Sequence, residues 1–266
     1  MTANPVSFDA CLRRFRNADF AGSLEYLEIL EARGFDTVKA AKDAAALGGL
    51  LHFQLGQFEE AIAAFSLVVF SSEGLFPDIR TDEEIAFVMA MSLLGASNAT
   101  RKDTLALLTN YASSPCKAFL DSDSFVPLRL IGHELERCNF GAALEILKGL
   151  AHVPHIDRIV NEFALKLLAQ MLPCFASLKL SEIQAELHMG HDDVLHALKH
   201  LITTVPELSH YRVNMQTGEV RQTMTSDQDK LNWAQAQTNR ALDEAVAQLK
   251  LFLLRLMIGE NSVAVD

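Results

Sequence analysis

The sequence predicts a mainly α-helical protein in which stacked helical pairs lead into a small mixed module with a β-hairpin and then into one long helix. Three observations support this prediction. Apolar residues recur at helical spacing around short turns up to about residue 155, strand-like segments interrupt the helices between residues 157 and 224, and a seven-residue apolar period follows. We therefore expect three parts, residues 1–155, 156–225 and 226–266, in a chain long enough to bury a substantial core.

The first part is predicted to be a TPR-like helical-repeat solenoid. A phenylalanine follows a short turn at Phe20, Phe58 and Phe140, which lie 38 and 82 residues apart. These intervals are close to one and two tetratricopeptide repeat lengths. The expected helical pairs are residues 8–33, 38–70 and 135–150, with a fourth, more degenerate pair between residues 93 and 108.

Residues 157–224 are predicted to form a winged helix, in the order helix, strand, helix, helix, hairpin. Apolar residues at helical spacing predict a first helix that ends near Pro173, because proline cannot continue the hydrogen-bond ladder. Segment 177–180 is too short for a helix and is predicted to be a strand. Ser181 is expected to cap the second helix, and Gly190 is expected to end it.

The third helix of this module is expected to begin at Asp192 or Asp193. The hairpin that follows has predicted strands at residues 211–215 and 220–223, with Gly218 in the turn between them. Together these elements make a small sheet whose strands complete the module.

Three hairpin residues are candidate partner-binding residues with two open interpretations. Tyr211, Val213 and Val220 alternate with polar residues, which is the ordinary pattern of a small sheet that covers a core. Alternatively, they belong to an open sheet edge that pairs with a strand of a neighbouring protein, because an edge has unpaired N–H and C=O groups. The sequence favours neither interpretation over the other.

A long C-terminal helix is predicted over residues 227–258. Its apolar residues recur every seven positions in neighbouring rows, which is the stripe of a helix bundle or coiled coil. Near its end almost every position is apolar, so we expect it to join partner helices rather than pack back onto the solenoid. Its candidate partner-binding residues are Leu242, Val246, Leu249, Phe252, Leu253 and Leu256.

No catalytic, cofactor-binding or metal site is predicted. The sequence contains no phosphate-loop, dinucleotide-binding or nucleophile-elbow motif. His196 and His200 are one helical turn apart, but no nearby cysteine or well-placed carboxylate completes a metal-ligand set, so we interpret them as surface residues. His133-Glu134 begins like a zinc-protease motif, but Arg137 stands where the second histidine is required. We therefore do not expect an enzyme.

Nucleic-acid binding through the third helix is a weaker alternative. The net charge of −11 disfavours a phosphate-binding surface. The third helix begins with Asp192 and Asp193 and carries only Lys199 as a fixed positive charge. Arg212 and Arg221 on the hairpin are too few to compensate. No nucleic-acid partner is therefore expected.

Cysteine usage and the hydropathy pattern predict a soluble intracellular protein. The four cysteines lie far apart without CxxC pairing, so we expect reduced, mostly buried thiols. The N-terminus lacks a basic region followed by an apolar run, and the longest apolar window is too short to cross a bilayer. We expect no membrane association.

Several short segments, in this order, are similar to one known family. They are Phe76-Pro77-Asp78-Ile79 with Ile85-Ala86-Phe87, residues 93–108, Cys116-Lys117-Ala118-Phe119-Leu120-Asp121, and residues 140–147. With the repeats, winged helix and terminal helix, they resemble PCI-domain proteins, the scaffold subunits of the proteasome lid, the COP-nine signalosome and translation initiation factor three. The resemblance covers residues 36–258 and is closest to the signalosome branch. Trp233 after a polar linker is more similar to the proteasome-lid branch, which is the alternative.

The resemblance implies a non-catalytic scaffold that is cytoplasmic and nuclear. In such complexes, winged helices join edge to edge and C-terminal helices gather into one bundle. The implied partners are other PCI-domain subunits and JAMM-family subunits, one of which carries out cullin deneddylation in the signalosome. Cullin-RING ubiquitin ligases are a further implied partner. The family usually has a considerably longer N-terminal region than precedes these repeats, so roles of that region do not carry over to this chain.

Overall fold

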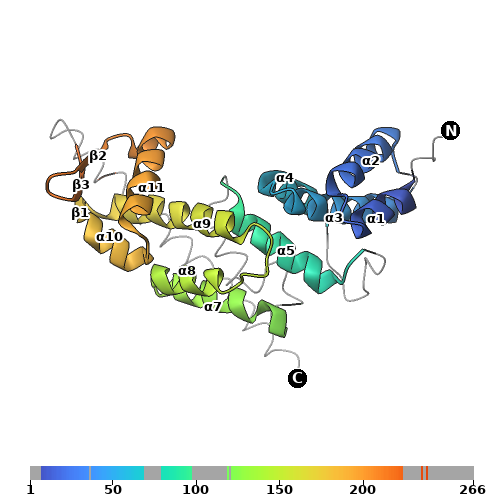
Figure 1. Cartoon of the computed structure of the whole chain (residues 1–266), viewed down its shortest axis with the longest axis horizontal. Coiled ribbons are helices and arrows are strands. Elements are labelled where there is room, and N and C mark those ends of the chain that lie inside the picture. Colours follow the sequence, from blue (N-terminus) through green and yellow to red (C-terminus); the bar gives the residue numbers. More distant parts are fainter. Residues whose placement is uncertain are drawn as a thin grey trace, which may run out of the picture.

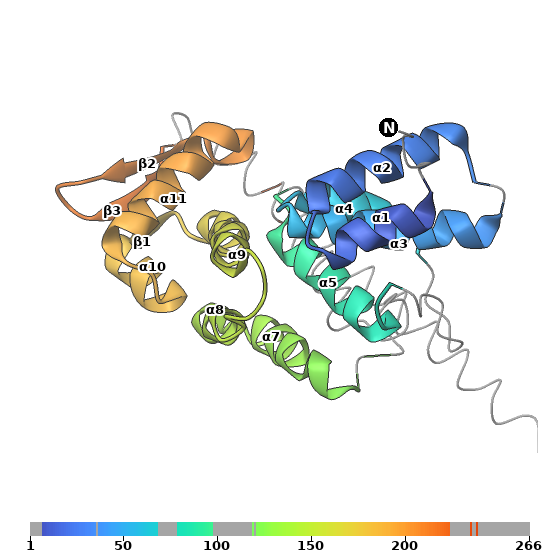
Figure 2. The ribbon, with the colours of Figure 1, turned by 45° about the vertical axis from the view of Figure 1, so that its right-hand side comes forward.

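The computed structural model describes residues 7–35, 37–68, 79–97, 119, 121–223, 235 and 238. Within them the chain is mainly helical and has one small three-stranded antiparallel sheet. The arrangement is elongated, with the N-terminal helices at one end and the sheet at the other (Figure 1). A turned view shows the same separation, with α5 and α9 between the two ends (Figure 2).

The described elements fall into a helical N-terminal part and a mixed part. The first contains α1 (Phe8–Arg16), α2 (Phe20–Arg33), α3 (Val38–Gln54), α4 (Phe58–Phe65), α5 (Asp82–Gly95), the 3-10 turn η2 (Asp123–Phe125), α7 (Val126–Glu136) and α8 (Phe140–Lys148). The second contains α9 (Ile156–Met171), η3 (Leu172–Cys174), β1 (Ser177–Lys179), α10 (Leu180–Leu187), α11 (His191–Thr204), η4 (Pro206–Leu208), β2 (Tyr211–Asn214) and β3 (Glu219–Gln222).

The pairs α1–α2, α3–α4 and α7–α8 are joined by turns of the same geometry. In each turn, the residue two positions before the phenylalanine has a positive φ: Ala18 at 59°, Gly56 at 73° and Cys138 at 58°. In each turn, the next backbone N–H donates to the carbonyl five residues earlier: Asp19 to Arg14 at 3.0 Å, Gln57 to His52 at 2.8 Å and Asn139 to Glu134 at 2.9 Å. In each pair, the phenylalanine is then the first residue of the second helix: Phe20, Phe58 and Phe140.

These shared turns confirm the three predicted helical pairs within the described residues. The second pair is described as far as Val68, and the third begins earlier than predicted because α7 starts at Val126. Most of the fourth predicted pair, between residues 93 and 108, lies outside the described residues, which end at Ser97 in this region. The same holds for most of the similar segment at 116–121.

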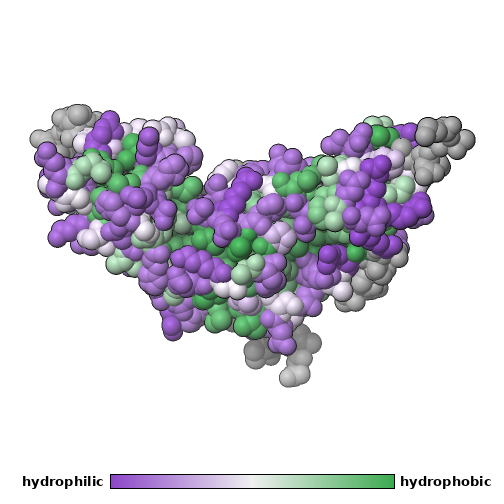
Figure 3. All heavy atoms as spheres, in the orientation of Figure 1, coloured by the Kyte–Doolittle hydropathy of each residue, from purple (hydrophilic) through white to green (hydrophobic). Residues whose placement is uncertain are grey.

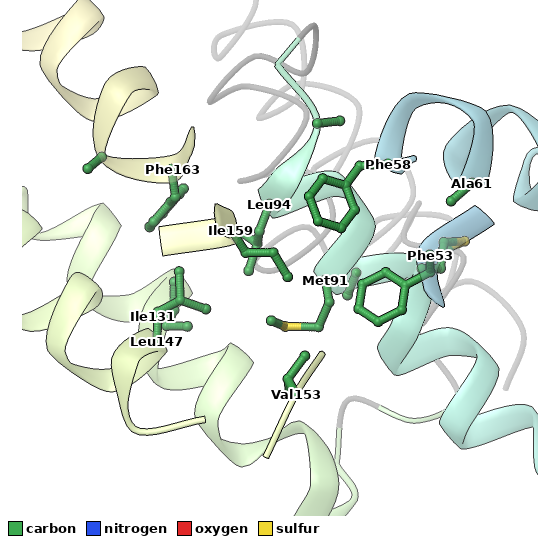
Figure 4. Packing of buried hydrophobic residues seen from close by; sticks show 14 of the residues in the cluster. Phe53, Phe58, Ala61, Met91, Leu94, Ile131, Leu147, Val153, Ile159 and Phe163 are labelled. Atoms are coloured by element: carbon green, nitrogen blue, oxygen red, sulfur yellow. The ribbon is translucent and has the colours of Figure 1, made fainter. Parts of the chain in front are cut away.

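Helix α9 packs against two helices of the N-terminal part, α5 and α8. Ile159 of α9 is fully buried and points toward Met91 and Leu94 of α5 in the core (Figure 4). The side chain of Lys166 is only 9% exposed, and its Nζ donates to the carbonyls of Leu93 at 2.9 Å and Leu94 at 3.0 Å. These carbonyls belong to the C-terminal end of α5, where a cation is favourable.

The start of α9 also contacts the turn between α3 and α4. Nε2 of His155 lies 2.9 Å from the carbonyl oxygen of Gln54. Arg158 donates to the carbonyl of Gly56 at 2.6 Å, and its guanidinium carbon lies 5.0 Å from the centre of the Phe58 ring. The turn carbonyls therefore obtain donors from a segment about a hundred residues later in the chain, and the buried residues of both parts form one continuous cluster.

The mixed part has the predicted order helix, strand, helix, helix, hairpin. Its sheet order is β1-β3-β2, and both pairings are antiparallel. The register places Leu178 and Val213 on either side of Val220. Tyr211 and Val220 point into the core beneath the sheet, whereas Arg212 and Arg221 point away from it, as alternation requires.

The predicted ends of α10 and α11 are wrong by one to three residues. Helix α10 begins at Leu180 rather than after a Ser181 cap, since Lys179 is its N-cap and donates its N–H to the Glu182 carboxylate at 3.0 Å. It ends at Leu187, and its C-cap His188 adopts the left-handed conformation with φ of 50°. Gly190 is instead the N-cap of α11, so that helix begins before Asp192 and Asp193.

The long helix predicted over residues 227–258 lies outside the described residues, apart from residues 235 and 238. The same holds for its candidate residues Leu242, Val246, Leu249, Phe252, Leu253 and Leu256, and for Trp233. Its prediction stands on the sequence.

Candidate partner-binding surface

Strand β2 lies at an edge of the sheet, because among the described residues it pairs only with β3. The N–H of Thr223 donates to the carbonyl of His210 at 2.8 Å, which fixes the alternation of the antiparallel ladder. Arg212 therefore directs its backbone N–H and C=O toward β3, and the backbone groups of Tyr211 and Val213 face outward. The outward pair at Val213 is the part of this edge that can accept another strand.

The side chain of Tyr211 lies in the core, since this residue is only 2% exposed. Its hydroxyl donates to the carbonyl of Leu172 at 2.9 Å and thereby links β2 to the end of α9. Burial raises the pKa of the Tyr211 phenol, and the nearby Cys174 thiol contributes in the same direction. For this side chain the core interpretation holds.

Val220 also belongs to the core, because its side chain is 1% exposed and β3 is the central strand. Both of its flanks are paired, so its backbone offers no open edge. Val213 differs, since its side chain is half-buried and it lies on the edge strand. Of the three hairpin candidates, Val213 alone combines an outward backbone with a partly accessible side chain.

A groove of about 350 Å³ lies between α11 and β2, next to that edge. Its apolar wall consists of Leu195 and Ile202 from α11 together with Val213 and Met215 from the hairpin. Met215 is 64% exposed, so its side chain is accessible to a partner. The groove can therefore receive an apolar side chain from a strand or helix laid along β2.

The sequence indicated the groove residues only in part. Leu195 and Ile202 of α11 are apolar but only half-buried, whereas Val194, Ala197, Leu198 and Leu201 make the buried face of this helix. The apolar stripe of this helix is thus wider than its core contact needs. That excess width was the signal for a surface groove.

Two cations border the groove, Lys199 and Arg212. Arg212 folds back along the strand and donates to the carbonyls of Ser209 and Tyr211, the latter at 2.7 Å. Its guanidinium therefore satisfies the outward carbonyl of Tyr211. A strand that adds to β2 has to displace Arg212 or to pair from Val213 onward, which limits the register of pairing.

The first turn of α11 is acidic. Asp192 and Asp193 are exposed in its first turn, where they repel an anion. Arg221 on the hairpin is paired with Glu219, with Nε of the arginine 2.8 Å from the carboxylate. Lys199 is thus the fixed cation that this helix presents.

The histidines at this end are exposed: His191, His196 and His200 on α11 and His188 before it. Across the part of the chain that the structure describes, no three histidine, cysteine, aspartate or glutamate side chains are placed to hold a metal ion. The expectation of mostly buried cysteines is wrong for Cys138 and Cys174, which are exposed, whereas Cys11 is buried. Cys138 is exposed because it occupies the left-handed position of a surface turn.

Comparisons with known proteins do not assign the chain to a family. No protein-family model matches it, and no curated protein is significantly similar to it. Among the described helices, none is long and apolar enough to cross a membrane.

Proposed function

We propose that the chain is a non-catalytic scaffold subunit of a multi-subunit complex of the PCI class. Within that class we assign it to the COP-nine signalosome, as a counterpart of subunit one. Its role is to hold other subunits in place while a separate JAMM-family subunit deneddylates cullins and so regulates cullin-RING ubiquitin ligases. The proposal rests on one observation above all, the order and sheet topology of residues 156–223.

The observed order supports the proposed winged helix. Helix α9, strand β1, helices α10 and α11, and the hairpin β2–β3 follow one another, with β3 between β1 and β2 in the sheet. This topology leaves β2 at an edge, beside the apolar groove under Met215 and Ile202. An edge strand with an adjacent apolar groove is what strand addition between neighbouring subunits requires, since the backbone supplies affinity and the groove supplies specificity.

Helical repeats ahead of the winged helix provide the second support. Three pairs share one turn geometry, and consecutive helices contact one another along the N-terminal part, α1 with α2, α2 with α3, α3 with α4 and α4 with α5. Such stacking of similar pairs is characteristic of a solenoid. The packing of these helical pairs against the mixed part through α9 supports the proposed layout, in which helical repeats lead into a winged helix.

Affinity purification of the tagged full chain from its own cells, followed by mass spectrometry, tests the proposal. Val213→Pro removes the outward N–H of β2 and leaves the ladder bonds to β3 in place, which an edge strand tolerates. Met215→Glu puts a carboxylate into the apolar groove. We expect wild-type protein to recover signalosome subunits and both variants to recover fewer, while a chain ending before Asp227 loses the contribution of the predicted bundle helix.

Leu130→Glu is the matched control, because Leu130 is an exposed apolar residue of α7, 47% exposed, outside this surface. Recovery of proteasome-lid subunits would assign the chain to the proteasome lid instead of the signalosome. The proposed role of the β2 edge and its groove would still hold. Recovery of neither complex, with wild-type protein monomeric, would refute the scaffold role. Equal recovery for Leu130→Glu and Met215→Glu would refute the role of the groove.

A further inference from the structure

A second groove, of about 510 Å³, lies in the N-terminal part, far from β2 along the chain. It is formed where α3 and α5 meet the turn η2 and the loop between α8 and α9. Figure 3 shows hydrophobic surface across the middle of one face of the molecule, flanked by hydrophilic surface on both sides. A hollow of this size is in the range that binds a ligand or a partner's side chains.

The floor of this groove is apolar and firmly packed. Phe53 is 1% exposed, and Phe87 meets the buried Phe125 ring edge to face, with 6.1 Å between ring centres. Val153 from the loop after α8 closes one side and belongs to the same buried cluster as Met91, and both are labelled in Figure 4. Because these residues are held by the core, the floor exists before any partner binds, which lowers the entropic cost of binding.

The groove continues into a neighbouring hollow of about 420 Å³. The two hollows share Phe15, Gln54, Arg80 and Glu84 in their walls. A depression that runs on in this way fits an elongated occupant, such as a peptide segment, better than it fits a compact small molecule.

The rim of the first hollow carries an excess of negative charge. Arg80 and Glu84 form an ion pair at 3.1 Å and compensate one another. Glu83 and Asp123 also line the groove, and among the described residues no ion pair is formed by either. An apolar floor beneath two uncompensated carboxylates is complementary to an apolar side chain that has a basic neighbour.

We infer that this groove docks a segment of a partner protein that carries an apolar anchor side chain next to lysine or arginine. The anchor lies on the floor made by Phe53, Phe87 and Val153, and the basic residue pairs with Glu83 and Asp123. A polyanionic partner such as nucleic acid is disfavoured by the same carboxylates. The inference goes beyond the scaffold role, since it shares no residue with the β2 surface and holds whether or not that role is correct.

Selection of random displayed peptides on the purified full chain tests this inference. Synthetic peptides of the selected sequences are then bound to the chain in solution and followed by fluorescence anisotropy. We expect the selected sequences to contain an aromatic or aliphatic residue beside Lys or Arg. The double variant Glu83→Lys/Asp123→Lys is expected to weaken their binding about tenfold or more, because it replaces attraction with repulsion.

Two further variants make the result specific to the groove. Ser124→Trp fills the hollow from an exposed position and is expected to reduce binding comparably. Glu28→Lys/Glu136→Lys makes the same charge change at exposed positions elsewhere and is expected to leave binding unchanged. The inference would be overturned if no sequences were enriched, if acidic sequences were enriched, or if the Ser124→Trp change left the affinity for the peptides unchanged. A dimer of the chain that the Glu83→Lys/Asp123→Lys change dissociates would overturn it as well.

Discussion

Replacing Tyr211 by phenylalanine tests the assignment of this residue to the core. The change removes one hydroxyl, whose hydrogen bond to the Leu172 carbonyl is 2.9 Å long and buried. The carbonyl keeps a second donor, the N–H of Phe175 at 3.1 Å, so no buried acceptor loses all of its partners. The cost is therefore that of one ordinary hydrogen bond, about 1 kcal/mol of unfolding free energy, without the larger penalty of an unpaired buried group.

The same substitution changes how stability depends on pH at the alkaline end. Because burial raises the pKa of Tyr211 in the folded protein, the unfolded chain loses this proton first as the pH rises. Below the unfolded pKa, about 10 for tyrosine, both states are protonated and the residue's contribution is fully present. Above that value stability falls with rising pH, because the folded state binds more protons than the unfolded state.

Urea unfolding followed by circular dichroism measures both effects. Near neutral pH we expect Tyr211→Phe to lower the transition midpoint with an unchanged denaturant slope. Above about pH 10 the difference between the two proteins should shrink, since only the wild type has the tyrosine to ionise. Equal stability at neutral pH, or a difference that stays constant into the alkaline range, would refute the buried hydrogen bond from Tyr211 to Leu172.

Three further substitutions probe the helical part by the same unfolding titration. Lys166→Met removes a buried ammonium that binds carbonyls at the end of α5, and we expect a loss of about 2 kcal/mol. Gly95→Ala places a methyl carbon 2.7 Å from the Phe58 ring, and we expect overpacking to cost about 1–3 kcal/mol. Thr81→Ala removes the hydroxyl that accepts the Glu84 N–H at the start of α5, and we expect a loss of about 1 kcal/mol. An unfolding free energy equal to that of the wild type would contradict the contact assigned to the residue concerned.

The helical pairs are predictable because their signal is local. An apolar stripe and a phenylalanine after a short polar turn suffice to place Phe20, Phe58 and Phe140 at the starts of helices. The left-handed residue of each turn is less visible, because only Gly56 is a glycine and the others are Ala18 and Cys138. At those two positions the helix contacts on both sides determine the backbone conformation, against the preference of the residue itself.

The ends of α10 are not predictable from nearby residues. The N–H of Leu180 donates to the carbonyl of Gly218 at 2.8 Å, so the hairpin, formed much later in the chain, decides where β1 ends and the helix begins. A serine at position 181 is a good cap by itself, but the sheet moves the boundary by two residues, to Lys179. A long-range contact here overrides a local preference.

The strands of the hairpin were predictable from the sequence, but the strand at the edge of the sheet was not. Alternation along the hairpin identifies Tyr211, Val213 and Val220 as a set, yet it cannot tell an edge strand from a central one. Only the pairing order β1-β3-β2 shows that Val220 is in the middle of the sheet. The groove depends on Met215 and Ile202 coming together from separate elements, which no short sequence pattern encodes.

The position of α9 against α5 has a consequence for how the chain is made. The ribosome releases α3, α4 and α5 well before it synthesises α9. The face of α5 around Met91 and Leu94 therefore stays exposed until α9 packs against it. During that interval the nascent chain displays an apolar surface, of the kind that chaperones bind and that causes aggregation. A fragment that ends at residue 155 lacks α9, so the apolar face of α5 stays exposed in it. We therefore expect the smallest fragment that is expressed in soluble form to extend through α9 rather than to contain the repeats alone.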